Sequence, residues 1–588
     1  MLPIKDQLSA LVSDAFERCG YDRALGVVQV SARPDLCQFQ CNGAMAAAKR
    51  YRKAPALIAG EVAACLQDVD CLAKAEVAAP GFLNLTLTDE ALKQAVEAML
   101  SEERFGIPGA EKDECIVVDY GGPNVAKPLH VGHLRAAVIG EAIKRLAKAL
   151  GYRTVGDVHL GDWGLQMGLV IAKLAQEQPE LCYFDPQYEG EYPAEPPVTL
   201  ADLSRLYPEA SALSKVDKEF YATAAQATFD LQNGRRGYMA LWKHLTALSV
   251  ADLKKNYANI CVDFDVWYGE SDSDPYIAPM LEDLISRGLA REDDGALVMD
   301  VAREDDASPM PPALIRKSDG SCLYVTTDMA TICQRMKDFK PDQILYVVDN
   351  RQSLHFEQVF RAVRQAGYAD ESVKLEFCGF GTMNGKDGKP YKTRDGGVMR
   401  LSDLIALITE AALAKITEAG FSDFDEAEKQ EVARKVGVAA LKYGDLMNQR
   451  SKDYVFDLDK FLSFEGKTGP YLLYTVVRIN SLLAKAEAAG AKPSALLAPQ
   501  SETERALMLR AALTSYPLWQ AMREKAPNVV CDNAYETAAL LNKFYNETRI
   551  IACEDEAQRG SWLTLLAFVR DLLRFQLDVL GIPVPERM

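Results

Sequence analysis

The stretch at residues 115–150 changes its pattern twice, and these changes restrict the fold more than any other part of the chain. CIVVDY is a short apolar run bounded by turn-forming residues, as in a buried strand. GGPNVAKPL follows as a loop, and HVGHLRAAVIGEAIKRLAKAL shows the periodicity of a helix that begins at about His130. Strand, loop and helix in succession predict a parallel sheet, with the loop at the carboxyl end of its strand. Ligands bind at that edge of open α/β sheets.

The length of 588 residues is too great for a single hydrophobic core, so about three domains are expected. Residues 1–108 predict a small α+β domain that begins with an amphipathic helix and ends near a hairpin at APGFLNLTL. Residues 109–400 predict a Rossmann-like parallel-sheet domain with a polar, helical insertion at about 175–260. Residues 401–588 are almost entirely amphipathic helix, so the predicted fold class is α/β with an all-α C-terminal domain.

The formal net charge of −18, taken alone, argues against a nucleic-acid partner, but binding depends on local patches rather than on the sum. Residues 434–485 carry nine Lys and Arg against five Asp and Glu, and residues 49–53 read KRYRK. A solvated helix face is the alternative for either patch. The thirteen cysteines contain no CxxC pair, which favours reduced thiols in a cytoplasm over a zinc ribbon or a disulfide framework. No signal peptide and no apolar run long enough to span a bilayer is present, so we expect a soluble, cytoplasmic protein.

His130 and His133 stand where the predicted strand, loop and helix create a helix start. Two imidazoles three residues apart lie on one face and can donate hydrogen bonds to a phosphate as charge develops. The helix start adds unpaired N–H groups and a positive dipole end, and Gly132 leaves the backbone bare for a base or ribose. A zinc site would need a glutamate between the histidines, as in HExxH, where Val131 and Gly132 stand. We therefore predict a phosphate site rather than a metal site or a packed pair of core histidines.

A glycine-rich loop, GTMNGKDGKPYKTRDGG, carries Lys386, Lys389 and Lys392 ahead of the helix predicted at LSDLIALITEAAL. Lysines on a glycine hinge can close over a polyphosphate and neutralise a leaving pyrophosphate. A solvated basic loop is the alternative.

PLHVGHLRAAVIG resembles the HIGH signature of class I aminoacyl-tRNA synthetases, and the flanks PNVAKPLHVGHLR and GDVHLGDWGLQMG are similar to arginyl-tRNA synthetases. The resemblance covers nearly the whole chain. It implies activation of L-arginine by ATP with Mg²⁺, then transfer to the 3′-terminal adenosine of tRNA(Arg), with tRNA needed before activation. It also implies that His130, Gly132 and His133 bind ATP and that the two histidines act catalytically.

The same resemblance assigns the lysines. KPYKT stands at the position of the family's KMSKS loop, so Lys389 and Lys392 are expected to bind ATP. Lys392 and Lys127, three residues before the first histidine, are expected to act catalytically by stabilising the departing pyrophosphate.

A pocket for arginine must match a guanidinium, which is planar, always charged and only a donor, and so should present carboxylates and aromatic rings. YVTTD places Tyr324 and Asp328 four residues apart at a strand-to-helix start. Without the resemblance, each of these would be an ordinary surface acid or strand-end tyrosine. The positions that match the family's arginine-binding residues are Asn124, Asp119, Tyr324, Asp328, Gln352 and Glu270.

KTGPYLLYTVVRINSLLAKA predicts a helix that begins at Pro470 and carries Tyr471, Tyr474 and Arg478 on one stripe. Such a stripe suits stacking against unpaired RNA bases, or it packs in a core with the apolar residues between its members. By resemblance, the C-terminal region is an anticodon-binding domain and the N-terminal domain contacts the outer corner of tRNA. The predicted activity is arginine–tRNA ligation by a monomer. The alternatives are another HxGH nucleotidyltransferase and a non-catalytic tRNA-binding paralogue.

Overall fold

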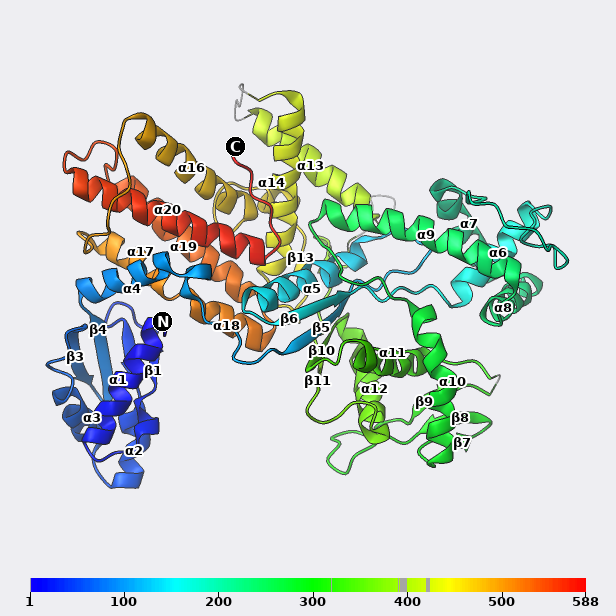
Figure 1. The fold of residues 1–588 in the computed structure, drawn as a ribbon, viewed down its shortest axis with the longest axis horizontal. Coiled ribbons are helices and arrows are strands. Elements are labelled where there is room, and N and C mark those ends of the chain that lie inside the picture. The colour runs from blue at the N-terminus through cyan, green and yellow to red at the C-terminus, as the bar shows by residue number, and fades with distance from the viewer. Residues whose placement is uncertain (1, 319, 390, 392–398, 419–423) are drawn as a thin grey trace.

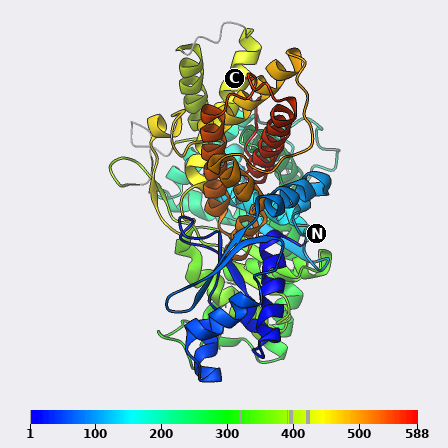
Figure 2. The ribbon, with the colours of Figure 1, turned by 90° about the vertical axis from the view of Figure 1, so that its left-hand side faces the viewer.

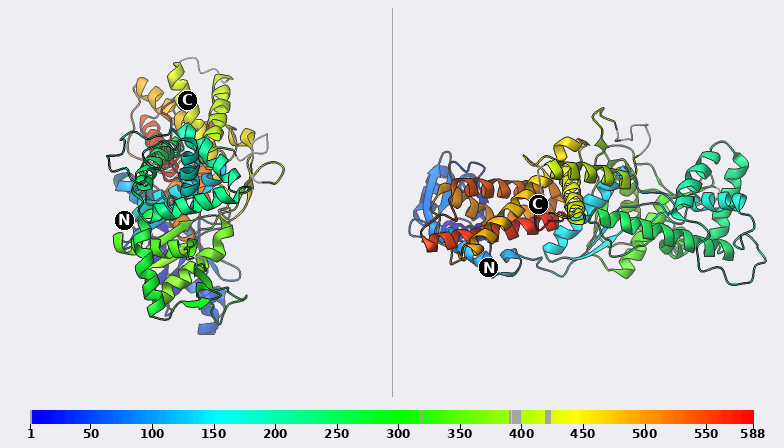
Figure 3. Two further views of the ribbon diagram at one scale, coloured as in Figure 1. Left: turned by 90° about the vertical axis from the view of Figure 1, so that its right-hand side faces the viewer. Right: turned by 90° about the horizontal axis from the view of Figure 1, so that it is seen from above.

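The computed structural model describes residues 2–318, 320–389, 391, 399–418 and 424–588, so Lys392 lies outside the described residues. The molecule is elongated, with a small N-terminal domain at one end, a parallel sheet in the middle and a group of inserted helices at the other end (Figures 1 and 3). The predicted fold class is confirmed: a Rossmann-like domain with a helical insertion, an α+β N-terminal domain and an all-α C-terminal domain. Among the helices of the described residues, none is long and apolar enough to cross a membrane.

The N-terminal domain contains short helices and strands, namely α1 (Ile4–Arg18), η1 (Arg23–Gly26), β1 (Val28–Val30), β2 (Phe39–Cys41), α2 (Gly43–Tyr51), α3 (Pro55–Ala64), β3 (Leu72–Ala78), β4 (Phe82–Leu87), α4 (Asp89–Ser101) and η2 (Glu103–Gly106). Its sheet is antiparallel throughout, in the order β1-β2-β4-β3, and β3 with β4 forms the predicted hairpin. The first helix buries Leu8, Val12 and Phe16 at the spacing of an amphipathic helix, as predicted.

The central sheet consists of four parallel strands, β5 (Cys115–Tyr120), β6 (Arg153–Asp157), β10 (Gln343–Val347) and β11 (Lys374–Phe377). Their order is β11-β10-β5-β6, so the predicted strand CIVVDY lies inside the sheet, and every one of its residues is buried. The segment FDVWYG continues this edge through single bridges, from Asp157 to Val266 and from Leu160 to Gly269. Because all strands are parallel, their carboxyl ends meet at one edge of the sheet.

Helices cover both faces of this sheet. α5 (Val131–Ala149) packs on the face that carries Ile116 and Val118. α11 (Tyr324–Asp338) and α12 (Ser353–Ala366), the latter preceded by η3 (Asn350–Gln352), pack on the face of Val117. Both faces are therefore apolar, which explains why CIVVDY is a continuous apolar run rather than an alternating one.

The insertion forms the end of the molecule farthest from the N-terminal domain (Figure 3) and contains α6 (Leu165–Glu177), α7 (Leu200–Leu213), α8 (Lys218–Gln232) and α9 (Arg236–Asn259). After it come α10 (Glu270–Ser286) and an antiparallel sheet of β7 (Arg291–Asp293), β8 (Ala296–Met299) and β9 (Ala313–Arg316). The sequence interpretation did not include this small sheet.

The C-terminal region is helical as predicted, with α13 (Leu401–Glu418), α14 (Glu426–Leu446), α15 (Leu458–Phe461), α16 (Gly469–Ala488), α17 (Glu502–Ala512), α18 (Ser515–Glu524), α19 (Pro527–Glu547) and α20 (Glu556–Val579). Its short strand β13 (Tyr454–Val455) pairs in parallel with β12 (Met383–Asn384), next to the predicted lysine loop.

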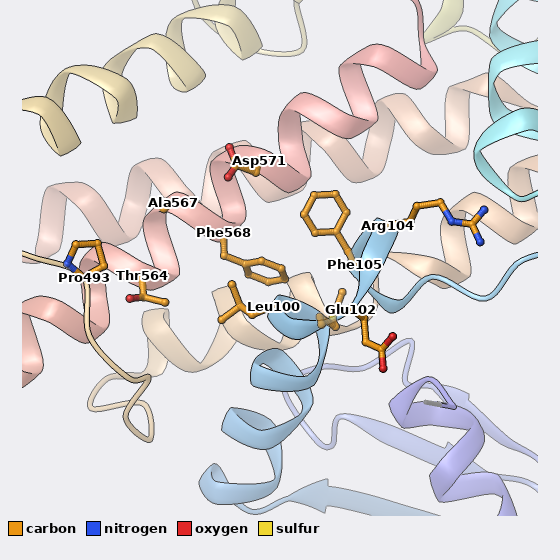
Figure 4. A pocket seen from close by; sticks show the side chains of 10 residues that line it. Leu100, Glu102, Arg104, Phe105, Pro493, Thr564, Ala567, Phe568 and Asp571 are labelled. Atoms are coloured by element: carbon orange, nitrogen blue, oxygen red, sulfur yellow. The ribbon is translucent and has the colours of Figure 1, made fainter.

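The N-terminal domain lies against the C-terminal helices, as Figure 2 shows, with α4 beside α17. The segment after α4 packs against the last helix: Phe105 of η2 meets Phe568 and Phe575 of α20 with ring centroids 5.9 and 5.6 Å apart. Phe105, Leu100 and Phe568 line a cavity of about 300 Å³ at this junction (Figure 4). The first and last domains are thus in direct contact.

Candidate active site

The two histidines of HVGH form the N-terminal cap of α5. Nδ1 of His130 accepts a hydrogen bond from the N–H of Gly132 at 3.0 Å, and Nδ1 of His133 accepts one from the N–H of His130 at 3.2 Å. A ring nitrogen that accepts carries no proton, so each neutral ring bears its proton on Nε2. Burial lowers the pKa of His130, and it lowers the pKa of His133 to about 3; the charge of Lys127 acts in the same direction on both. At pH 7, two neutral rings with centroids 4.0 Å apart each present an Nε2–H donor.

The unpaired N–H groups expected at this helix start are already bonded, so that part of the prediction is wrong. Val131 N–H donates to the carbonyl of Met399 at 3.1 Å, and His133 N–H donates to the carbonyl of His130 at 2.9 Å. Gly132 also makes room for its neighbour, because a Cβ there would lie 2.8 Å from Cε1 of His130, and its predicted contact with ATP stays a prediction. Glycine allows the imidazole to fold back over its own helix, and the donors for a phosphate are therefore side chains.

The loop before α5 is fixed against the loop after β6. Val125 N–H donates to the carbonyl of Gly161 at 2.9 Å. This contact presses Asn124 against Gly161, where a Cβ would lie 2.4 Å from Oδ1 of Asn124. Lys127 points toward the insertion, with its Nζ 4.7 Å from the ring centroid of Tyr207. Asn124 thus contacts the loop after β6, and Lys127 contacts the insertion.

Both ends of the lysine loop are fastened to α5. At the far end, Arg400 forms an antiparallel bridge with His130. At the near end, Arg135 donates from Nη1 to the carbonyl of Gly381 at 2.6 Å. The described residues at the two ends of the loop are therefore held against the helix that bears the imidazoles.

The three predicted lysines differ in what the structure says of them. Lys386 pairs with Asp457 of the C-terminal region at 3.4 Å. Lys389 is exposed, and its backbone carbonyl accepts from the N–H of Gly385 at 2.7 Å. The prediction for Lys392 falls on a residue outside the described part of the chain.

Asp119 is paired within the protein. Nη2 of Arg335 donates to the carboxylates of Asp119 and Asp157, each at 2.6 Å. Arg335 is completely buried, and burial raises the pKa of Asp119 while the guanidinium opposes this effect. A contact between Asp119 and bound arginine would require the carboxylate to be shared with Arg335, so its predicted role stays a prediction.

Asp328 has a partner that sequence reasoning missed. Its Oδ2 lies 2.5 Å from Nε2 of His355, across the facing starts of α11 and α12. Tyr324, one turn earlier on α11, is 72% exposed, so its ring is free to meet a ligand. Gln352, directly before α12, is also exposed. The structure therefore brings these predicted residues to one place, at the end of β10.

Glu270 is the first residue of α10, and its carboxyl lies close enough to Asp328 to feel its charge. Burial raises its pKa to about 7; the nearby carboxylates of Asp162 and Asp328 act in the same direction, and His159 acts against them. Asp162 accepts hydrogen bonds from N–H and Oγ of Ser271 at 3.0 and 2.6 Å. A carboxyl whose pKa is raised to about 7 marks a position suited to a cation.

The predicted RNA stripe on α16 is partly exposed and partly held by α19. Oη of Tyr471 accepts from Nδ2 of Asn542 at 3.0 Å, and the guanidinium of Arg478 lies 3.9 Å from the ring centroid of Tyr545. Tyr474 is 42% exposed. The stripe is thus neither a core stripe nor a free one, but part of an aromatic and polar surface shared by two helices.

Sequence reasoning used two of the chain's five histidines and missed His159 and His355, which lie at the same sheet edge. The small number of histidines in the chain could have drawn attention to these two. His159 lies in HLGDWG after β6, and His355 follows closely on DNRQ after β10. Within the described residues, no group of three or more His, Cys, Asp or Glu side chains is placed to hold a metal ion.

Comparisons with known proteins agree along the whole chain. The profile of the family described as tRNA synthetases class I (R), catalytic domain, matches residues 95–458. The profiles described as DALR anticodon binding domain and Arginyl tRNA synthetase N terminal domain match residues 472–588 and 4–87.

Individual relatives and solved structures are similar over the same span. The sequence is 51% identical over 583 residues to arginine–tRNA ligase of Alkaliphilus oremlandii, covering 99% of each chain. It is 47% identical over 591 residues to that of Hyphomonas neptunium, covering 100% of each. The fold matches the arginyl-tRNA synthetases of Plasmodium falciparum (TM-score 0.82, 22% identity) and Thermus thermophilus (TM-score 0.80, 24% identity), with 100% of each chain covered.

Proposed function

Because the chain belongs to the arginyl-tRNA synthetase family, we propose that the sheet edge framed by α5, α10, α11 and α12 is where it activates arginine and charges tRNA(Arg). The reaction is the ligation of arginine to tRNA in two steps. First, an oxygen of the arginine carboxylate attacks the α-phosphorus of ATP, and the bond to the bridging oxygen breaks to release pyrophosphate. Second, a ribose hydroxyl of the terminal adenosine attacks the acyl carbon, AMP leaves with the bonding electrons, and the hydroxyl loses its proton.

The observation that carries the proposal is the pair of neutral imidazoles at the start of α5. Each presents a fixed Nε2–H, so their hydrogen bonds strengthen as negative charge grows on the phosphate oxygens. Lys127, whose charge lowers the pKa of both rings, brings a cation to the same place. Lys389 and Lys392 act from the loop anchored on either side, and Mg²⁺ enters with ATP as part of the substrate.

In this proposal, arginine binds on the other side of the imidazoles from the lysines that contact the phosphates. Asp328 and Glu270 face the two cationic ends of the substrate, Tyr324 packs against its stem, and Gln352 and Asn124 add hydrogen bonds. The pairing of Asp328 with His355 supports this assignment, because a carboxylate already oriented by an imidazole loses less entropy when it binds a guanidinium. Asp119 orients this wall through the buried guanidinium between it and Asp157.

We propose that tRNA(Arg) contacts the surface of Tyr471, Tyr474 and Arg478, and that the N-terminal domain adds a second contact. Residues 108 and 400 are the proposed domain boundaries. A reducing cytoplasm is supported by the thirteen cysteines, all free even where Sγ of Cys19 lies 3.4 Å from Sγ of Cys65. The monomeric state stays a prediction.

Exchange of labelled pyrophosphate into ATP tests the function. We expect exchange that depends on L-arginine and on tRNA, and we expect His133→Ala to lower its kcat by about 10²- to 10³-fold, as loss of one transition-state donor does elsewhere. His244→Ala, in the inserted helices, is the matched control and should keep the rate of the unaltered protein. No arginine-dependent exchange with tRNA present would contradict the function; equal exchange without tRNA would contradict the tRNA requirement.

The pKa of Glu270 predicts how arginine binding depends on pH. A bound cation favours the ionised carboxylate, so binding releases a proton and becomes tighter as pH rises through about 7. The KM for arginine should fall about fivefold to tenfold between pH 6 and 7.5. Glu270→Gln should flatten this dependence, whereas Glu282→Gln, an exposed residue on the same helix, should not. An equal slope in Glu270→Gln would remove Glu270 from the arginine site.

A further inference from the structure

Two cysteines of the N-terminal domain are in direct contact at the ends of neighbouring helices. Cys19 follows α1, Cys65 follows α3, and their Sγ atoms lie 3.4 Å apart. The two helices lie side by side (Figure 1), and Phe16, Ile58 and Val62 belong to the same apolar core. The packing of the domain therefore brings the two sulfur atoms together, although they are 46 residues apart in the chain.

Backbone hydrogen bonds hold both cysteines at their helix ends. The N–H of Cys19 donates to the carbonyl of Ala15 at 3.1 Å, and the N–H of Cys65 donates to that of Val62 at 3.1 Å. Nη2 of Arg18 donates to the carbonyl of Cys65 at 3.4 Å, which connects the two ends. A disulfide bond is about 2 Å long, so its formation would need an approach of about 1.4 Å. Helix ends move more easily than helix interiors, so this approach leaves the core in place.

Other cysteines of this domain are bonded differently. Sγ of Cys37 donates to a serine hydroxyl, and Sγ of Cys41 donates to a backbone carbonyl, each at 3.3 Å. Both of these side chains are buried, whereas Cys19 and Cys65 are half-buried. A small reagent therefore reaches the contacting pair more easily than it reaches Cys37 or Cys41.

The two contacting thiols differ in how readily they react. Burial raises the pKa of Cys19 to about 11, and the hydrogen bond and charge of Cys65 act in the same direction. The charge of Glu61 adds to this effect, and Arg18 opposes it. At pH 7 Cys19 is thus a protonated thiol and a poor nucleophile, so Cys65 attacks first. Once Sγ of Cys65 is bonded to another sulfur, it carries no charge, and its contribution to the raised pKa of Cys19 ends.

We propose that Cys19 and Cys65 form an oxidation site, which a small disulfide converts into a reversible cross-link that restrains the N-terminal domain. The thiolate of Cys65 attacks one sulfur of the small disulfide, a mixed disulfide forms, and the other half leaves as a thiolate. The thiolate of Cys19 then attacks Sγ of Cys65, the mixed disulfide breaks, and the second half leaves. The protein loses two electrons and two protons, and the small disulfide accepts them and becomes two thiols.

The cross-link would enclose residues 20–64, which include the basic run KRYRK. Tyr21, two residues after Cys19, already connects this segment to α3, because its Oη donates to Glu61 at 2.5 Å and its ring centroid lies 4.9 Å from that of Tyr51. Closing a loop of this length restricts the unfolded chain, so local unfolding of the domain should become rarer. The proposal goes beyond the proposed function and does not depend on it, because its measurements need no turnover.

Peptide mapping without reduction tests the proposal. The full chain is incubated with oxidised glutathione at pH 7, the remaining thiols are alkylated, and the peptides are identified by mass spectrometry. The variants are Cys19→Ser and Cys65→Ser, and Cys71→Ser, another half-buried cysteine of the domain, is the matched control. Thermal unfolding of each variant checks that the chain folds. Cleavage by trypsin within residues 20–64 is then compared between the reduced and the oxidised unaltered protein.

We expect a peptide that joins Cys19 to Cys65 in the unaltered protein and in Cys71→Ser, and its loss when dithiothreitol is added. In Cys19→Ser, glutathione should stay bound to Cys65, and Cys65→Ser should form no cross-link. Cleavage within residues 20–64 should be slower in the oxidised protein by about tenfold or more. Glutathione that remains on Cys65 of the unaltered protein, a cross-link to a different cysteine, no reaction, or equal cleavage of the two forms would overturn the proposal.

Discussion

Replacing Asp328 by asparagine lowers kcat/KM for arginine by about 10²- to 10³-fold in aminoacylation. Asparagine keeps the size of the side chain but removes the charge that we propose faces the guanidinium, in a position where the aspartate side chain is 16% exposed. Loss of a desolvated charge partner costs about 2–5 kcal/mol, and most of it should appear in the KM for arginine. Asp338→Asn, at the exposed end of the same helix, should leave these constants unaltered.

Two further measurements test whether Asp328 acts on the guanidinium itself. Citrulline has the shape of arginine without its charge, so Asp328→Asn should reduce discrimination between the two amino acids. His355→Ala should raise the KM for arginine less than Asp328→Asn does, since it removes only the group that orients the carboxylate. An unchanged arginine KM in Asp328→Asn would place the guanidinium elsewhere.

Local patterns predicted the elements that build the proposed phosphate side of the site. CIVVDY is β5 to the residue, and α5 begins directly after His130, because an apolar run, a turn-rich loop and a helical period are each encoded within a few neighbouring residues. The spacing of His130 and His133 placed both on one face. What the spacing did not reveal is that each ring bonds a backbone N–H, which fixes the tautomer and occupies the helix end.

The proposed arginine side of the site depends on contacts between distant parts of the chain, and no local pattern encodes them. Asp328 and His355 are 27 residues apart, and Asp119 and Arg335 are 216 apart. The resemblance supplied Asp328 and Asp119 as positions, but their partners follow only from the order of the strands. The sheet of β7, β8 and β9 was missed for a different reason: its strands are short, and charged residues interrupt the apolar pattern of β7 and β9.

Arg135 connects three parts of the molecule whose relative positions matter for the proposed activation step. It is 2% exposed, and its Nε pairs with Asp445 of α14 at 3.0 Å. Nη1 donates to the carbonyls of Gly381 and Lys452 at 2.6 and 3.1 Å. The same guanidinium therefore joins the imidazole-bearing helix, the start of the lysine loop and the C-terminal helical region, in which α16 packs on α14.

Arg135→Ala should lower both stability and catalysis. Removing one partner of a buried ion pair costs about 3–5 kcal/mol, so the midpoint of urea denaturation should fall clearly. At a temperature where the variant stays folded, kcat for pyrophosphate exchange should fall by about 10²-fold or more, with smaller changes in the KM values, since misplacement of a catalytic group by ~1 Å has effects of this size. Arg135→Lys should restore only part of the rate, because an ammonium cannot reach the carboxylate and two carbonyls as a planar fork does.

The control for this prediction is Arg145→Ala on the same helix. Arg145 pairs with Glu141 at 2.6 Å, but its side chain is 29% exposed and it contacts neither the lysine loop nor α14 through a hydrogen bond or ion pair among the described residues. We expect this variant to be less stable than the unaltered protein by a smaller margin and to keep its kcat. A fall in kcat that is equal in the two variants would mean that Arg135 matters only for stability. A fall confined to Arg135→Ala, partly restored by lysine, would show that the register of the loop against the imidazoles sets the rate of activation.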